Sequence, residues 1–184
     1  MGLLKGQTAI ITGAASPRGL GKATAKLFAE HGARIAILDL NADHAAEAAA
    51  DLGDGHIGLA CDVTRKADCD AAVAVVLEAF GQIDILVNNA GITQPLKIMD
   101  ISHENYDAVL DVNLLGTLNM SQAVIPHMRG RKTGKLVNMS SVSAQRGGGI
   151  FGGPHYSAAK AGVLGLTKAM ARELAPDGIR SNAI

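Results

Sequence analysis

The sequence predicts an α/β fold with a doubly wound parallel sheet in a single domain. Short apolar, β-branched runs alternate with longer amphipathic stretches, which is the pattern of successive βαβ units. The runs are almost continuously apolar, as is typical of strands covered by helices on both faces. The chain has 184 residues, 48% of them hydrophobic and 18% charged, which is enough for one sizeable core.

The individual elements follow from this alternation and from the residues that interrupt it. Strands are predicted over residues 8–12, 34–40, 57–61, 83–88, 135–139 and 179–184. Helices are predicted over residues 20–31, 41–52, 64–80, 102–128 and 156–174. Thr64 and Ser102 are the expected N-caps of the third and fourth helices. Gly32, Gly53 and Gly81 end the first three helices, and Pro176 follows the last.

Composition excludes several classes of function. Lys and Arg number 17, as do Asp and Glu, so the formal net charge is zero and we expect neither nucleic acid nor a membrane as a partner. Cys61 and Cys69 are too few for a disulfide framework or a four-ligand zinc site, and the six histidines lack metal-binding spacing, so no metal is expected. The first residues lack a signal peptide and no apolar run approaches ~20 residues, which predicts a cytoplasmic protein.

The chain ends at Ile184, inside an apolar strand and with no turn after it. An unpaired strand edge invites association. We therefore expect the sequence to be a truncated form of a longer chain, in which further residues supply a C-terminal strand and part of the substrate region.

A glycine-rich turn joins the first predicted strand to the first predicted helix. Its glycines supply backbone angles that a β-carbon forbids and allow the main chain to approach a pyrophosphate closely. Unpaired N–H groups and the helix dipole at the same place favour an anion. The turn predicts a dinucleotide site formed by Gly13, Ser16, Arg18, Gly19, Leu20 and Gly21.

An acidic residue indicates which dinucleotide is bound. Asp39 ends the second strand, 18 residues after Gly21. Its carboxylate can accept hydrogen bonds from ribose hydroxyls and would repel a 2′-phosphate. Arg18 points the other way, since a guanidinium can hold a 2′-phosphate. We favour NAD over NADP because Asp39 is the better-placed residue.

Two residues four apart on the last helix suggest acid–base chemistry. The heads of Tyr156 and Lys160 can converge on one site. A phenol ordinarily ionises near pH 10, and a cation about 4 Å away stabilises the phenolate by roughly 4 kcal/mol at an effective dielectric of ~20. Such a phenol can exchange a proton with an alcohol or carbonyl oxygen while a nicotinamide exchanges a hydride. Ser141 would hydrogen-bond the same oxygen.

Taken together and in this order, the motifs resemble the short-chain dehydrogenase/reductase family over the whole chain. The resemblance rests on the glycine-rich turn, Asp62-Val63, Asn88-Asn89-Ala90-Gly91, Asn113, Ser140-Ser141-Val142, Tyr156 and Lys160. Two spacings depart from the family: five residues rather than three separate Gly13 from Gly19, and the 15 residues from Ser141 to Tyr156 exceed the usual spacing by two. Both look like lengthened loops that leave the motifs in place.

The resemblance implies a Rossmann-like catalytic domain over residues 1–184 and roles for individual residues. Asn113 would anchor a water in the proton relay, and its position inside a helix, where Asn is unfavourable, suggests a local backbone or water contact. Lys160 would also hold the nicotinamide ribose, and the family's Ser-Val pattern selects Ser141 over Ser140. Asp62 and Val63 would contact the adenine, and Asn89, Ala90 and Gly91 would line the adenosine ribose.

The expected function is the transfer of a hydride between NAD(H) and a small secondary alcohol or ketone. Two alternatives are an NADP-dependent 3-oxoacyl-thioester reductase of the same family and a cofactor-binding module without turnover. A nucleotide-sugar epimerase or dehydratase fits less well, because its glycine spacing differs. Gln94, Gln145, Arg146 and His155 hint at a polar substrate.

The two long helices also predict an oligomer. Helices 102–128 and 156–174 carry apolar residues on more than one face, which favours packing against a second copy. By resemblance, these helices pair with their copies in a homodimer or homotetramer.

Overall fold

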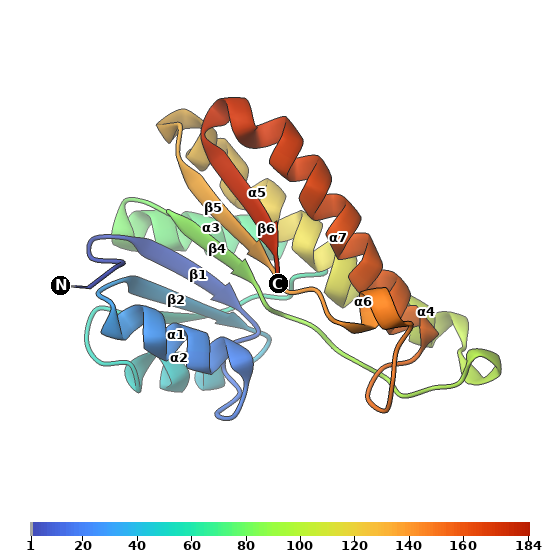
Figure 1. Cartoon of the computed structure of the whole chain (residues 1–184). Helices are drawn as coiled ribbons and strands as arrows, with labels where there is room; N and C mark the ends of the chain where they lie inside the picture. The colour runs from blue at the N-terminus through green and yellow to red at the C-terminus, as the bar shows by residue number, and fades with distance from the viewer. Residues whose placement is uncertain (1) are drawn as a thin grey trace.

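The computed structural model describes residues 2–184 and shows a six-stranded, all-parallel sheet with helices packed against it (Figure 1). The strand order is β3-β2-β1-β4-β5-β6, so the chain runs outward from β1 to one edge and then from β4 to the other. This doubly wound arrangement confirms the predicted fold class. It also places a crevice at the carboxyl ends of β1 and β4, where the winding reverses.

The first half of the chain comprises β1 (Thr8–Thr12), α1 (Leu20–Glu30), β2 (Arg34–Asp39), α2 (Ala42–Ala50), β3 (Ile57–Ala60) and α3 (Lys66–Phe80). The second half comprises β4 (Ile85–Asn88), η1 (Ile98–Asp100), α4 (His103–Leu110), the π-helical turn η2 (Asp111–Leu115), α5 (Gly116–Arg131), β5 (Gly134–Asn138), α6 (Ser143–Arg146), α7 (Pro154–Leu174), η3 (Ala175–Asp177) and β6 (Ile179–Ala183). Most predicted elements are found within two residues of their expected bounds.

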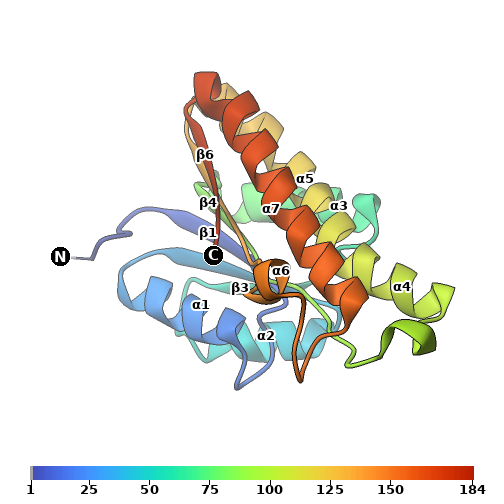
Figure 2. The ribbon, with the colours of Figure 1, turned by 45° about the vertical axis from the view of Figure 1, so that its right-hand side comes forward.

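Two apolar clusters hold the sheet between its helices. Small side chains of α1 and α2, such as Ala25 and Ala48, pack with Ile11 and Ile37 on one face. Larger side chains of α3, α5 and α7 pack on the opposite face, among them Val76, Met120 and Leu174. Figure 2 shows α3, α5 and α7 together on this second side, with α4 and α6 beside the start of α7.

The structure corrects three sequence-based predictions about these elements. Thr64 does not cap α3: the helix begins at Lys66 after Arg65, because the Thr64 hydroxyl donates to the Asp62 carboxylate (2.7 Å). The helix predicted over residues 102–128 is interrupted by the π-helical turn. The sheet is not covered on both faces throughout, since residues in β5 alternate between buried and half-buried and those in β6 between buried and more exposed.

The continuous helical stretch His103–Arg131 is long enough to cross a membrane, with a mean hydropathy of 1.2 in its most apolar window. Such a helix is weak evidence for a membrane span, because core helices of soluble proteins pass the same test. Here Val124 and Met128 are fully buried against the sheet and α7. Ser102 caps this stretch as predicted, accepting a hydrogen bond from the Asn105 N–H (3.2 Å).

Candidate active site

A groove of about 550 Å³ lies at the carboxyl ends of the central strands. It is lined by residues from the β1–α1 turn and from the segments that follow β2, β3 and β4. Nine of the predicted cofactor residues line it: Gly13, Gly19, Leu20, Asp39, Asp62, Val63, Asn89, Ala90 and Gly91. Of the others, Ser16 borders an adjoining pocket, Arg18 is exposed on the turn and Gly21 is buried at the start of α1.

The glycine-rich turn is shaped by close main-chain packing. Gly13 has a φ of +63°, and a β-carbon there would lie 2.7 Å from the Ala90 Cα. A β-carbon on Gly21 would lie 2.9 Å from the Ala14 Cα. The longer loop between Gly13 and Gly19 is closed by a hydrogen bond from the Gly19 N–H to the Ser16 carbonyl (3.0 Å). The lengthened loop therefore leaves both ends of the turn in place.

Asn89 joins the ends of β1 and β4. Its side-chain amide donates to the carbonyls of Thr12 and Gly13, both at 2.9 Å. The Thr12 hydroxyl accepts the N–H groups of Asn89 and Ala90. These bonds satisfy the polar groups where both strands end, so Asn89 holds together the backbone segments that line the groove.

Asp39 faces the glycine-rich turn from the end of β2. Its carboxylate accepts the N–H of Ala15 and that of Leu40, each at 2.9 Å. These two bonds fix both oxygens, and each oxygen keeps a further lone pair for a ligand hydroxyl. Asp39 thereby stands at the boundary between the groove and the adjoining pocket.

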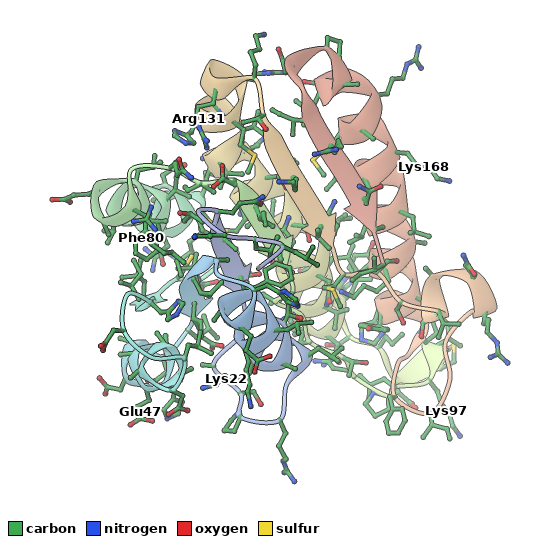
Figure 3. All side chains as sticks on the ribbon, turned by 60° about the vertical axis from the view of Figure 1, so that its left-hand side comes forward. Lys22, Glu47, Phe80, Lys97, Arg131 and Lys168 are labelled. Carbon is green, nitrogen blue, oxygen red and sulfur yellow. The ribbon has the colours of Figure 1, made fainter. Side chains whose placement is uncertain are left out.

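The adjoining pocket, about 390 Å³, is lined by three carboxylates, one lysine and His44. Glu47 and Asp51 of the α2 region line it together with Asp39. Its lysine, Lys22, is already engaged: the ammonium donates to the Ala48 carbonyl (3.0 Å) and pairs with Asp51 (2.8 Å). Figure 3 shows Lys22 on α1 and Glu47 on α2 at the same end of the molecule. The pocket is therefore a poor place for an additional phosphate.

The wall beside Asp39 follows β3 and is held by hydrogen bonds and close packing. Asp62 accepts the N–H and the hydroxyl of Thr64. The Val63 carbonyl accepts a hydrogen bond from the buried Asn119 amide (2.9 Å), and a β-carbon on Gly116 would lie 2.6 Å from Val63 Cγ2. This wall has little room to move toward α5.

Asn113 lies in the π-helical turn and is fully buried. Its amide donates to the carbonyls of Val109 and Ile92, both at 2.8 Å. The bond to Val109 replaces helix pairing locally, and π-turns of this kind often mark functional sites. Within residues 2–184, its Oδ1 is one of three buried side-chain atoms that lack a hydrogen-bond partner.

Lys160 reaches the same place from α7. A β-carbon on Gly91 would lie 2.7 Å from Asn113 Oδ1 and 3.5 Å from Lys160 Nζ, so both polar atoms converge on this bare backbone. The ammonium donates to the Met139 carbonyl (2.7 Å) and lies 5.8 Å from the centre of the Tyr156 ring. Lys160 is only 4% exposed, and burial lowers its pKa to about 8.

The two neighbouring serines have different partners. The Ser140 hydroxyl donates to the Lys160 carbonyl (2.9 Å) and so ties the end of β5 to α7. The Ser141 hydroxyl accepts the Ser143 N–H (3.1 Å), which leaves its proton to be donated elsewhere. Of the two hydroxyls, that of Ser141 is therefore the one that can still donate a hydrogen bond.

Comparison with known proteins decides the family. A sequence model of the family described as short chain dehydrogenase matches residues 7–184. The chain belongs to this family. It is 62% identical over 186 residues to a short-chain type dehydrogenase/reductase of Sinorhizobium fredii that is described as uncharacterised, which covers 99% of this chain and 74% of that protein.

Other short-chain dehydrogenase relatives carry different activities in their names. The chain is 43% identical to a sorbitol dehydrogenase of Cereibacter sphaeroides, over 98% of this chain and 70% of that one. The crystal structure of a 3-ketoacyl-(acyl-carrier-protein) reductase from Brucella melitensis, complexed with NADH, superposes with a TM-score of 0.92 at 38% identity, covering 98% of this chain and 75% of that one.

Sequence reasoning missed several residues of the groove. Leu40, Cys61, Thr64, Ile92 and Val112 also line the groove. Leu40 is 73% exposed although it follows an apolar strand, and its position directly after Asp39 was the available signal. Ser140 was set aside for Ser141, and only the fold reveals its bond to α7.

Two of the polar residues suggested as substrate contacts, Gln94 and His155, make contacts within the protein. His155 is buried, with its Nε2 3.1 Å from the Gln94 side-chain oxygen. Gly153 donates its N–H to the Gln94 carbonyl (2.9 Å), so this pair fastens the segment after β4 to the start of α7. Around them, large apolar side chains are exposed, including Val142, Ile150 and Phe151. Gln145 and Arg146 are exposed in the same region, so the surface before α7 carries both apolar and polar side chains.

Proposed function

We propose that this short-chain dehydrogenase transfers a hydride between NAD(H) and a secondary alcohol or ketone, with Tyr156 as the acid–base group. The single observation that carries the proposal is the convergence of Asn113 Oδ1 and Lys160 Nζ on Gly91, at the end of the groove next to Tyr156. Two buried polar groups, from a π-turn and from a helix, are held beside one bare main-chain position. A merely structural pair would gain little from such an arrangement.

The residues present fit a dinucleotide. The main chain at Gly13 is packed so closely that no side chain fits, and the Asn113 Oδ1 has no partner among the described residues. The turn and the start of α1 would hold the pyrophosphate, Asp39 the adenosine ribose, and Asp62 and Val63 the adenine. When bound, the nicotinamide supplies the hydride acceptor or donor.

The chain's own residues would carry the proton. Tyr156 Oη exchanges it with the substrate oxygen, and the Ser141 hydroxyl donates a hydrogen bond that holds that oxygen in place. The Lys160 ammonium stabilises the phenolate form of Tyr156 and holds the nicotinamide ribose. Asn113 Oδ1 would accept a hydrogen bond from a water that passes the proton onward.

NAD is the preferred cofactor in this proposal. The pocket beyond Asp39 carries Glu47 and Asp51, and its Lys22 is paired with Asp51. A 2′-phosphate placed there would meet three carboxylates, whose repulsion disfavours NADP. The NADH in the structure of the Brucella melitensis reductase is in keeping with this choice.

A second candidate is the reduction of a 3-oxoacyl thioester with NADP. The likeness to a 3-ketoacyl-(acyl-carrier-protein) reductase and the exposed apolar side chains of Ile150 and Phe151 favour the acyl substrate. The acidic pocket beside Asp39 argues against NADP. A cofactor-binding module without turnover is a further alternative, which the presence of Asn113, Ser141, Tyr156 and Lys160 together disfavours.

The proposal includes an assembly and a location. Apolar side chains of the α4–α5 stretch and α7, including Leu110, Leu114 and Leu166, border an open hollow of about 560 Å³. A second copy packed there would give a homodimer or homotetramer. A cytoplasmic location fits the two free cysteines, because thiols stay reduced in that compartment.

Tyr156→Phe tests the proposed function, and the chain's other tyrosine provides the matched control. We expect kcat to fall by about 10²–10⁴-fold, because the ring still packs but the proton carrier is gone. NADH binding, followed by fluorescence, should stay within about twofold. Tyr106→Phe, on α4, should leave both quantities unchanged. Retention of more than about a tenth of the wild-type kcat by Tyr156→Phe would exclude this role.

A further inference from the structure

Residues 92–96, the segment that follows β4, connect two helical parts of the site. The Ile92 carbonyl accepts a hydrogen bond from the buried Asn113 amide (2.8 Å). Two residues further on, the Gln94 carbonyl accepts the N–H of Gly153, the residue directly before α7 (2.9 Å). Segment 92–96 is therefore bonded to the π-helical turn at one point and to the start of α7 at another (Figure 1).

A side-chain bond adds to the bond between Gln94 and the start of α7. His155 Nε2 lies 3.1 Å from the Gln94 side-chain oxygen. An amide oxygen can only accept, so the neutral ring carries its proton on Nε2 and donates it to Gln94. Within residues 2–184, the other ring nitrogen, Nδ1, is buried and has no hydrogen-bond partner. The bond to Gln94 is therefore the polar contact that orients this ring, which is only 2% exposed.

Two neighbouring glycines before α7 connect this contact to Tyr156. A β-carbon on Gly152 would lie 2.5 Å from Tyr156 Cδ1, so the ring packs directly on the main chain there. A β-carbon on Gly153 would lie 2.5 Å from the Leu96 carbonyl oxygen and 3.0 Å from His155 Cε1. The main chain that supports the Tyr156 ring is therefore itself packed against the segment that follows β4.

We propose that Gln94 and His155 are positioning residues, whose side-chain hydrogen bond holds the Tyr156 hydroxyl in place at the groove. The pair acts through the main chain and needs no contact with substrate or cofactor. It fixes the first turn of α7 against the segment that also bonds to Asn113, so that Tyr156 and Asn113 keep a constant separation. This inference rests on the proposed function, in which Tyr156 carries the proton.

The size of the expected effect follows from the geometry of proton transfer. A general acid or base must lie within hydrogen-bond distance of the atom it protonates, and a displacement of about 1 Å can lower a rate by about 100-fold. Loss of the side-chain bond leaves the bond from the Gly153 N–H to the Gln94 carbonyl and that from the Thr93 hydroxyl to the Phe151 carbonyl. The start of α7 should therefore stay folded but be held by fewer contacts.

Three variants remove or restore the side-chain bond. His155→Phe keeps a ring and removes the donor, whereas Gln94→Ala removes the acceptor. His155→Gln restores a donor, because its amide nitrogen lies as many bonds from the Cα as His155 Nε2 does. Gln122→Ala, at an exposed position of α5, is the matched control for Gln94→Ala.

Turnover is measured with NADH and with fructose, cyclohexanone or an acetoacetyl thioester, whichever the wild type reduces fastest. We expect kcat to fall by about 10–100-fold in His155→Phe and in Gln94→Ala, with the KM for the ketone and for NADH within about threefold of wild type. The double variant should match the slower single variant within about twofold, because both changes remove one bond. His155→Gln should recover most of the lost kcat, and Gln122→Ala should match wild type.

A second measurement does not depend on turnover. The chain has two tyrosines and no tryptophan, so Tyr156 is the only tyrosine in a Tyr106→Phe background. Its near-ultraviolet circular dichroism reports how rigidly the ring is held. We expect the tyrosine band to weaken in Gln94→Ala and in His155→Phe, and to return in His155→Gln.

The results separate positioning from its alternatives. An unchanged kcat with a lower urea midpoint would overturn the proposal and leave the bond a purely structural role. A higher KM for the ketone with kcat unchanged would also overturn it, because the two side chains would then contact the substrate directly. If the wild type reduces none of the ketones with NADH or NADPH, the proposed function fails. The tyrosine band then decides alone: weakening in the variants supports the positioning of Tyr156, and no change overturns it.

Discussion

The two halves of the candidate site are built from different material. In the half that follows β1 and β2, the groove is formed mainly by main chain, with Gly13 packed on Ala90 and Asp39 holding two N–H groups. In the half formed by the π-helical turn η2 and α7, the site consists of buried side chains, chiefly Asn113 and Lys160. We therefore expect substitutions that add atoms to damage the first half, and substitutions that remove atoms or charges to damage the second half.

Gly13→Ala is the change expected to have the largest effect on the first half. The new β-carbon would lie 2.7 Å from the Ala90 Cα, at a φ of +63° that L-residues seldom adopt. We expect the Kd for NADH to rise by more than about 100-fold and the unfolding free energy to fall by about 1–3 kcal/mol. Calorimetric titration and urea unfolding measure the two effects.

Gly53→Ala is the matched control for this change. Gly53 has a φ of +100°, but a β-carbon there would meet nothing within 4 Å. The variant should show the backbone cost of about 1–2 kcal/mol and unchanged NADH binding. Equal loss of binding in both variants would show that strain, rather than close approach, accounts for the result.

Lys160→Met tests the second half through its buried charge. Burial lowers the pKa of Lys160 to about 8 from 10.5, so between these values the unfolded chain binds more protons than the native state. The stability of the wild type relative to the variant should therefore be constant below pH 8 and rise between pH 8 and 10.5, by up to about 3 kcal/mol.

Lys168→Met provides the control on the same helix, because Lys168 points away from the body of the molecule (Figure 3). Urea unfolding at pH 7, 8, 9 and 10 compares the three proteins. A wild-type curve parallel to that of Lys160→Met across this range would show that the native and unfolded states release this proton at the same pH.

The parts of the site also differ in how much the sequence could predict. Gly13, Asp39 and Tyr156 each lie next to the end of a strand or the start of a helix. Hydrophobic periodicity and the glycines predict those boundaries, and they therefore also predict where these residues lie. The fold class follows for the same reason. The π-turn around Asn113 does not, because its bond to the Ile92 carbonyl joins residues 21 apart in the chain. The unfavourable Asn inside a helix was the only local signal.

Tertiary contacts explain the remaining differences from prediction. Thr64 has a good capping side chain, but Asp62 takes its hydroxyl and moves the start of α3 to Lys66. Ser140 and Ser141 are adjacent residues of the same type. Only the packing of α7 near the end of β5 gives the Ser140 hydroxyl its partner, the Lys160 carbonyl. Competition between neighbouring side chains and packing between distant segments therefore determine these features, which hydrophobic periodicity alone does not predict.

Asp39→Ala is expected to have the smallest effect of the three changes and tests cofactor choice in the first half. The variant loses the acceptor for the ribose hydroxyls and one of the charges facing the acidic pocket. We expect the ratio of kcat/KM for NAD to that for NADP to fall about tenfold. Asp43→Ala, in the first turn of α2, removes the same charge from an exposed position and should change the ratio by less than about twofold. If the wild type already prefers NADP, Asp39 does not set the preference, and the exposed Arg18 is the residue to vary instead.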